Sequence, residues 1–123
     1  MTAKTRIALI AHDGRKPHMV AFVKDYLDRL SAMELVATGT TGDHIAQTGL
    51  NVTKKLSGPQ GGDAQIAAMV AEGLLDGIIF FRDPLGKHPH EPDVQMLMRI
   101  CDVHDVPLAT NPAAARLLLQ GLA

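Results

Sequence analysis

Three residues of this chain have side chains suited to moving a proton. Asp63 follows a pair of glycines, and His90 and Asp93 lie in the short segment Pro89-His90-Glu91-Pro92-Asp93. A carboxylate can act as a general base, and histidine is the side chain best able to polarise or protonate an oxygen near neutral pH. The two prolines restrict the backbone around His90. These residues are therefore candidates for general acid–base catalysis.

Both carboxylates also have a purely structural explanation. Asp63 directly precedes an apolar stripe of helical period, and Asp is a common N-cap residue. Asp93 lies in the first turn of another predicted helix, where the helix dipole favours an acidic side chain whatever the function. From the residues alone, both the structural and the catalytic interpretation stay open.

Two glycine-rich segments have the composition of a phosphate site. The segment Thr38-Gly39-Thr40-Thr41-Gly42 combines hydroxyl donors with glycines and opens a helix, whose N-terminus favours an anion. Ser57 and Gly58, followed by Pro59, begin a second donor-rich turn before the next helix. Neither segment has the Walker lysine or the dinucleotide glycine spacing. Together they predict a site for a small phosphate ester, although each alone is also explained as a cap or a tight turn.

The six histidines raise the question of a metal site. No established zinc spacing occurs, and a single cysteine cannot supply thiolate ligands in the usual number. We therefore predict that the protein binds no metal. The nearest approaches to a ligand set are His88 and His90 with Glu91 and Asp93, or His12 with Asp13. The histidines expected on helix surfaces are His18, His44 and His104.

An α/β fold must position these residues. Short apolar runs rich in β-branched residues alternate with segments of helical period, which is typical of a mainly parallel sheet. The predicted strands are 7–11, 35–38, 51–54, 78–81 and 107–109. The first predicted helix begins at Lys16 and has a stripe of Val20, Val23, Leu27 and Leu30. A short helix is predicted after Thr41, and further helices from Asp63 to Gly73 and from about Pro92. The last predicted helix runs from Pro112 through Leu119 and is capped by Asn111.

The candidate residues fall where such a fold binds ligands. In open α/β sheets, ligands lie beyond the carboxyl ends of the strands, where loops meet helix N-termini. The polar segments 12–16, 38–42, 57–63 and 83–93 all occupy such positions. We therefore expect four loops to converge at one edge of the sheet.

Composition restricts the class of protein. The 123 residues fit a single domain spanning 1–123, and 12 Lys and Arg nearly balance 13 Asp and Glu, so neither nucleic acid nor an anionic membrane is an expected partner. No apolar run approaches the roughly 20 residues of a membrane span, and no signal peptide is evident. Cys101 lies in an apolar stripe and is expected to be a buried filler in a reducing compartment. These features predict a cytoplasmic protein.

Taken together, the motifs resemble the methylglyoxal synthase family over nearly the whole chain. Six segments in order, at family-like spacing, make the resemblance specific. These segments are Ile10-Ala11-His12-Asp13 with Lys16, Ala37-Thr38-Gly39-Thr40-Thr41-Gly42, Leu56-Ser57-Gly58-Pro59 with Gly61-Gly62-Asp63, Phe80-Phe81 with Asp83-Pro84-Leu85, Pro89-His90-Glu91-Pro92-Asp93-Val94, and Ala109-Thr110-Asn111.

The resemblance implies a Rossmann-like three-layer sandwich with a five-stranded, mainly parallel sheet and helices on both faces, assembled as a homohexamer. It implies a lyase, free of metal and organic cofactor, that converts dihydroxyacetone phosphate to methylglyoxal by proton abstraction, enediolate formation and phosphate elimination. Inorganic phosphate is then the second product and an expected inhibitor.

The resemblance also implies residue roles. Asp63 takes the position of the catalytic base, His90 and Asp93 surround the reacting centre, and His12 contacts the substrate. The phosphate-binding positions are Lys16, Thr38, Gly39, Thr40, Thr41, Ser57 and Gly58.

An alternative from another class is a non-catalytic module that binds a phosphate effector, because the same fold occurs attached to carbamoyl-phosphate synthetase. Such a module needs no base or oxyanion donor, so the presence of Asp63, His90 and Asp93 favours the enzyme. One feature departs from the family. Longer members continue beyond the last helix with a tail that carries a basic residue, whereas this chain stops at Ala123, and the resemblance therefore does not extend to phosphate-driven cooperativity.

Overall fold

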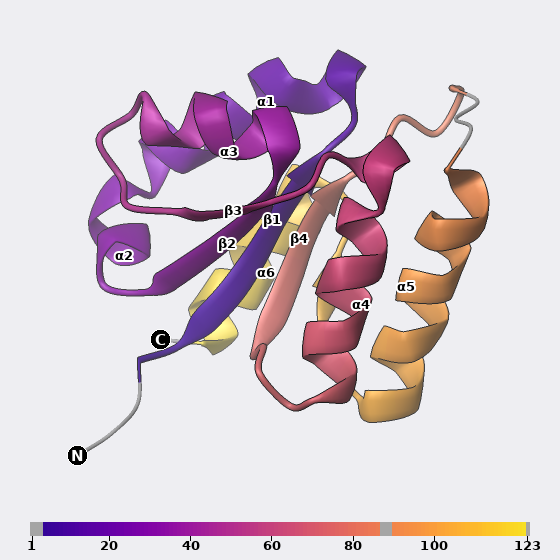
Figure 1. Ribbon diagram of the computed structural model, residues 1–123. Helices are drawn as coiled ribbons and strands as arrows, with labels where there is room; N and C mark the ends of the chain where they lie inside the picture. Colours follow the sequence, from indigo (N-terminus) through magenta and orange to yellow (C-terminus); the bar gives the residue numbers. More distant parts are fainter. Residues whose placement is uncertain (1–3, 87–89, 123) are drawn as a thin grey trace.

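A single parallel sheet organises the chain. The computed structural model describes residues 4–86 and 90–122, and within them five strands pair in the order β3-β2-β1-β4-β5 (Figure 1). Every pairing in this sheet is parallel. The strands are β1 Arg6–Ala11, β2 Glu34–Thr38, β3 Thr53–Lys55, β4 Gly77–Phe81 and β5 Leu108–Ala109.

Helices cover both faces of this sheet. One core cluster contains side chains of α4 and α5, and the other contains side chains of α1, α2, α3 and α6. Figure 1 shows α4 and α5 side by side against one face. The α-helices are α1 Lys16–Asp25, α2 Leu27–Ser31, α3 Gly39–Ala46, α4 Gly62–Ala71, α5 Glu91–His104 and α6 Pro112–Gly121, with 3₁₀ turns η1 Asp13–Arg15 and η2 Gly58–Gln60.

Two cores form because successive side chains along each strand point to opposite faces of the sheet. In β4, Ile79 and Phe81 join the core on the α1 side, whereas Ile78 and Phe80 join the core on the α4 side. All five residues of β4 are buried, as expected for a strand covered on both faces. The predicted three-layer α/β sandwich is thereby confirmed.

The helix predicted from Lys16 is in fact two helices. Tyr26 leaves helical geometry (φ −123°, ψ 27°), and α2 begins at the next residue. Val23 before the break and Leu30 after it are both fully buried in the same core. Because apolar residues keep helical spacing on both sides of Tyr26, the sequence pattern contains no sign of the break.

The helix after β2 begins earlier than predicted. Its first residue is Gly39 rather than one after Thr41, and Thr38 is the N-cap residue in an extended conformation. A Cβ at Gly39 would lie 2.7 Å from the Cα of Ser57, so glycine permits the close approach of the two predicted phosphate segments. The early start of α3 thus brings its N-terminus next to the Ser57 turn.

The remaining elements follow the predictions closely. Asn111 caps α6, accepting a hydrogen bond from the N–H of Ala114 at 2.9 Å, and Pro112 is the first residue of that helix. Cys101 is buried, and burial, with a smaller contribution from Asp102, raises the pKa of its thiol to about 11. His18, His44 and His104 are exposed on helices, as expected. Among the helices of the described residues, none combines the length and apolar character that a membrane span requires.

Candidate active site

A pocket of about 210 Å³ lies at the carboxyl edge of the sheet. It is formed where four separate segments meet: the ends of β1 and β2, the turn around η2 with the start of α4, and the residue before α5. This confirms the predicted convergence of four loops. The residues that line it are Ile10, Ala11, His12, Asp13, Lys16, Thr38, Gly39, Thr40, Thr41, Ser57, Gly58, Pro59, Asp63 and His90.

Asp63 does not cap its helix, so the N-cap prediction is wrong. Helix α4 begins at Gly62 and its N-cap residue is Gly61, which adopts a left-handed conformation (φ 103°). Gly62, the first residue of the helix, packs so closely that a Cβ there would lie 1.9 Å from the carbonyl oxygen of Leu56. Asp63 therefore lies inside the first turn with its side chain 1% exposed, where the helix dipole favours its negative charge.

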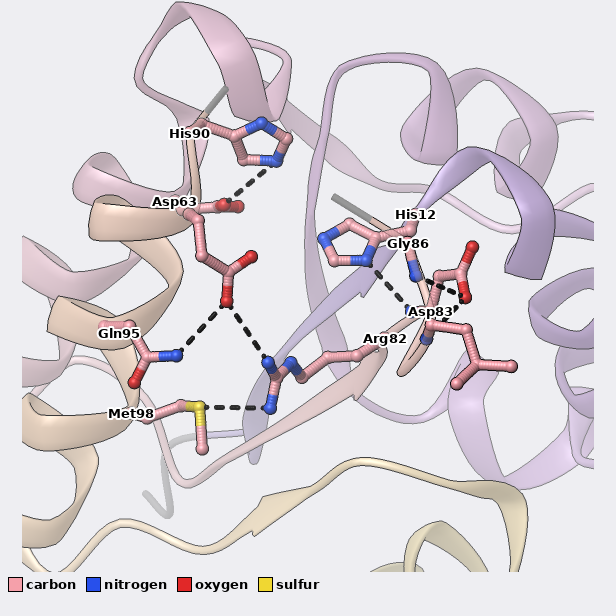
Figure 2. Close-up of polar contacts among 10 residues, drawn as sticks. His12, Asp63, Arg82, Asp83, Gly86, His90, Gln95 and Met98 are labelled. Atoms are coloured by element: carbon pink, nitrogen blue, oxygen red, sulfur yellow. Dashed lines mark hydrogen bonds and ion pairs between the residues drawn. The ribbon is translucent and has the colours of Figure 1, made fainter. Parts of the chain in front are cut away.

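Asp63 and His90 form a buried pair at the pocket. The Nε2 atom of His90 lies 3.7 Å from Oδ2 of Asp63, and their side chains are 8% and 1% exposed (Figure 2). Gly58 passes against both, because a Cβ at this position would lie 2.8 Å from His90 Nε2 and 3.5 Å from Asp63 Oδ2. The pair therefore joins α4 to the start of α5. The backbone at Gly58, a predicted phosphate-binding position, lies directly beside it.

His12 approaches the same pair from the end of β1. Its ring is 6% exposed and packs edge-on against His90, with 5.7 Å between ring centroids, and against Phe80 at 5.2 Å. Its Nδ1 accepts a hydrogen bond of 3.0 Å from the backbone N–H of Asp83. The structure thus places two imidazoles and a carboxylate around one small volume.

The phosphate segments contribute two kinds of donor. The first N–H groups of α3 have no acceptor within the helix, and Thr38, Gly39 and Thr40 at its start line the pocket. Thr41 is 2% exposed, and its hydroxyl donates to the backbone carbonyl of Ala11 at 3.3 Å. This hydrogen bond links α3 to β1 and uses the hydroxyl proton of Thr41. The exposed side chain of Thr40 is therefore the better candidate for a hydroxyl that donates a hydrogen bond to an anion.

Lys16 supplies a cation to the lining of the pocket. It is the first residue of α1, and its Nζ pairs with Asp13 across η1. The side chain of Lys16 is 13% exposed, whereas that of Asp13 is 98% exposed. An anion in the pocket would therefore meet an ammonium group that is already oriented by a solvated carboxylate.

Asp93 is the one predicted site residue that does not line the pocket. It lies half-buried in the first turn of α5, and its N–H donates to the carbonyl of His90 at 2.9 Å. As for a metal, no group of three or more His, Cys, Asp or Glu side chains suited to hold one occurs in residues 4–86 and 90–122. His88, part of the alternative metal hypothesis, lies outside the described residues.

Two residues that sequence reasoning did not single out hold the loop before α5. A guanidinium nitrogen of Arg82 lies 3.4 Å from Oε1 of Glu91, which also accepts from Gln95 at 3.1 Å, and so links the end of β4 to the start of α5. Asp83 folds the following turn and contacts His12 through its backbone. An Asp-Pro pair one residue after an apolar run is a recognised turn signal, and it could have indicated Asp83.

Known proteins are similar to this chain over most of its length. The family model described as "MGS-like domain" matches residues 18–110. A methylglyoxal synthase from Burkholderia cenocepacia (strain HI2424) is 56% identical over 122 residues, which cover 98% of this chain and 94% of the relative. One from Burkholderia thailandensis is 58% identical, with 96% and 92% covered. The crystal structure of methylglyoxal synthase from Elizabethkingia anophelis NUHP1 superposes with a TM-score of 0.88 at 40% identity, covering 94% of this chain and 77% of that one.

Proposed function

The chain belongs to the methylglyoxal synthase family, and we propose that its pocket binds dihydroxyacetone phosphate and eliminates phosphate from it. The enzyme is accordingly a lyase that acts on a small phosphate-bearing molecule. The observation that carries the residue assignment is the buried Asp63–His90 pair, 3.7 Å apart, in the same pocket as the N-terminus of α3. A base, an oxyanion donor and a phosphate site are all within reach of one three-carbon substrate.

The phosphate group binds at the α3 end of the pocket. Backbone N–H groups of the first turn of α3, the hydroxyls of Thr40 and Ser57, and the backbone at Gly58 donate to its oxygens, while Lys16 balances its charge. Thr38 and Thr41 are nearly fully buried and keep this end of the pocket in shape. A helix N-terminus favours an anion through both its dipole and its N–H groups.

Asp63 removes a proton from the hydroxymethyl carbon beside the ketone. The electron pair moves onto the ketone oxygen, giving an enediolate, and a donor to that oxygen lowers the barrier. His90 contacts Asp63 directly and is one donor, and His12 on the opposite side is the other. Asp93 acts next to this centre by holding the turn that carries His90, since its N–H is bonded to the His90 carbonyl.

Elimination completes the reaction. The hydroxyl on the deprotonated carbon becomes an aldehyde, its proton moves to the former ketone oxygen, the double bond shifts toward the phosphate-bearing carbon, and the C–O bond to phosphate breaks. Protonated Asp63 passes its proton to the departing phosphate and is thereby restored as a base. The remaining enol becomes methylglyoxal by a shift of its hydroxyl proton to the terminal carbon. The substrate carbonyl itself accepts the electron pair, so the chemistry requires no metal and no organic cofactor.

A product assay tests this function. The purified chain incubated with dihydroxyacetone phosphate should release methylglyoxal and inorganic phosphate in equal amounts, with the same yield after exhaustive chelation. Formation of glyceraldehyde phosphate alone would show an isomerase. Phosphate binding without turnover would show an effector-binding module, and loss of activity together with stoichiometric zinc or iron would show a metal enzyme.

We also propose that the chain is a single domain spanning 1–123 that assembles as a homohexamer in the cytoplasm, with inorganic phosphate as an inhibitor. The family resemblance supports the hexamer, two cores on the faces of one sheet support the single domain, and the single buried cysteine suits a reducing compartment. A sedimentation mass of six chains is the expected result. A monomer or dimer at working concentration would contradict the assembly.

A further inference from the structure

We propose that Asp83 is a positioning residue that fixes His12 in the tautomer carrying its proton on Nε2, so that His12 presents a neutral N–H donor to the pocket. The catalytic part of this proposal rests on the proposed function, whereas the tautomer is a property of the free protein. One contact, from the backbone after β4 to the side chain at the end of β1, determines this tautomer.

The direction of that contact determines where the proton lies. The backbone N–H of Asp83 donates to Nδ1 of His12 at 3.0 Å. A backbone N–H only donates, so Nδ1 must offer its lone pair. In a neutral imidazole, the proton is then on Nε2, and Figure 2 shows this nitrogen directed toward the side of the site where Asp63 and His90 lie. A proton on Nδ1 would face the amide hydrogen and lose the hydrogen bond.

The side chain of Asp83 holds its own backbone in this orientation. Its Oδ1 accepts from the N–H groups of Leu85 and Gly86, both at 3.1 Å, which closes a turn of the kind Asp commonly makes. Pro84 inside this turn has a restricted φ and no competing N–H. The amide of Asp83 is therefore held at a defined place rather than on a freely moving loop.

The receiving side is equally fixed. Ala11 pairs with Phe81 in the parallel register, and the N–H of His12 continues the ladder by donating to the Phe81 carbonyl at 3.2 Å. His12 thus follows the paired end of β1 by one residue, and Asp83 follows the paired end of β4 by two residues. The ring of His12 is further confined by edge contacts with Phe80 and His90, and its 6% exposure leaves little room to flip.

The functional consequence is a division of labour between the two histidines. His90 contacts the carboxylate of Asp63, whereas His12 has one nitrogen committed to the backbone and the other directed to the pocket. A neutral N–H held ready is suited to an oxyanion that develops only during the reaction, because no reorganisation is needed at that moment. Among the described residues, the titratable groups that line this pocket with His12 are Asp63, His90, Asp13 and Lys16.

Imidazole ¹⁵N spectra of the labelled, ligand-free protein at mildly alkaline pH test the tautomer directly, since a free imidazole is neutral there. The expected spectrum shows the proton of His12 on Nε2 and an unprotonated Nδ1. The opposite tautomer, a rapid average of both, or an imidazolium would overturn the proposal. This arm does not depend on turnover, so it separates a failure here from a failure of the proposed function.

Two variants of Asp83 test the positioning role. Asp83→Asn keeps the Oδ1 acceptor of the turn and should retain both the Nε2–H tautomer and kcat. Asp83→Ala removes the acceptor and should give mixed tautomers, with kcat falling toward the about 100-fold loss typical of one missing oxyanion donor. Its affinity for inorganic phosphate should be unchanged. A folded Asp83→Ala protein with the original tautomer and kcat would refute the proposal, as would equal loss of kcat in both variants with the tautomer unaltered.

Discussion

Asp63, His90 and His12 come from three different segments, namely the first turn of α4, the N-cap of α5 and the end of β1, and each side chain is buried because another segment packs over it. Gly58 covers the Asp63–His90 pair, and the edge of the His90 ring meets His12. Burial matters chemically because hydrogen bonds and charges act more strongly where water is excluded. The same burial makes each residue sensitive to substitution in a way that depends on its role.

Thr40→Val should weaken phosphate binding without changing the fold. Thr40 is exposed in the first turn of α3, so its hydroxyl donates to the ligand rather than to the protein. Losing this hydrogen bond should cost about 0.5–1.5 kcal/mol in the binding of substrate and of inorganic phosphate alike. Isothermal titration with phosphate measures the change. Thr53→Val, on the exposed face of β3, is the matched control, and an equal loss in both variants would remove Thr40 from the phosphate site.

His90→Asn should act on the reacting end of the substrate instead. We expect nearly unchanged affinity for inorganic phosphate, lower kcat, and a larger loss of affinity for an enediolate-mimicking inhibitor than for substrate, as complementarity to the transition state requires. Titrating both ligands against the variant separates these effects. His104→Asn, exposed at the end of α5, serves as the control. Proportional loss of phosphate and inhibitor affinity would place His90 in the phosphate site or in the structure.

The convergence of most candidate site residues on one pocket could be predicted from the sequence, because polar segments that follow parallel strands meet at one edge of the sheet. What could not be predicted is which atom does what. The hydroxyl of Thr41 is committed to the Ala11 carbonyl, and Asp63 lies inside its helix rather than at the cap. Both facts depend on packing between segments that are distant in sequence. Local composition carries no information about such packing.

The start of α4 is the element that sets the position of the base. Gly61 ends η2 in a left-handed conformation, and Gly62 then packs against Leu56 so that Asp63 enters the first turn. Leu56 itself is held by Gln65, whose side-chain oxygen accepts from its N–H at 2.8 Å. The turn and the helix therefore fix one another, and neither can shift without moving Asp63.

Gly62→Ala should accordingly destabilise the protein and lower activity together. The added methyl would lie 1.9 Å from a backbone carbonyl oxygen, which no side-chain movement relieves. We expect a loss of about 1–3 kcal/mol in the free energy of unfolding, the range for overpacking a close contact. Urea denaturation provides the value. Gly121→Ala, with no atom within 4 Å of the added Cβ, should leave stability nearly unchanged, and comparable effects of the two substitutions would disprove the packing explanation.

Strands were easier to predict than helix boundaries. A strand covered on both faces, such as β4, must be apolar along its whole length, so its run of Ile and Phe is unambiguous. Helix ends depend on tertiary contacts instead. The break at Tyr26 and the early start of α3 both occur where apolar spacing or hydroxyl composition continues without interruption.

In the molecule as a whole, the residues that stabilise the fold are separate from the candidate site. They form the two cores, one on each face of the sheet. Polar chemistry is confined to one sheet edge, while Cys101 and its neighbours on α5 pack into the core on the α4 side. A buried cysteine of this kind reports on the integrity of the core and not on the active site.

Cys101 should therefore resist alkylation in the native state and react readily in urea. Burial raises the pKa of its thiol from 9.0 to about 11, so the thiolate is scarce at neutral pH. A raised folded-state pKa also gives a stability contribution that is complete below pH 9 and is lost as pH rises toward 11. Iodoacetamide labelling followed by mass spectrometry measures the reactivity. Equal labelling rates in buffer and in urea would show that the core on the α4 side is open.

Turnover of Asp63→Asn decides whether Asp63 is the base. The amide keeps the size of the side chain but cannot accept the proton, so methylglyoxal formation from dihydroxyacetone phosphate should fall by a factor on the order of 100 to 10,000. Phosphate affinity and the unfolding midpoint should stay near those of the parent. Asp105→Asn, an exposed residue in the left-handed conformation that Asn also tolerates, should retain full activity. A folded Asp63→Asn enzyme that forms methylglyoxal at the parental rate would show that Asp63 is not the base.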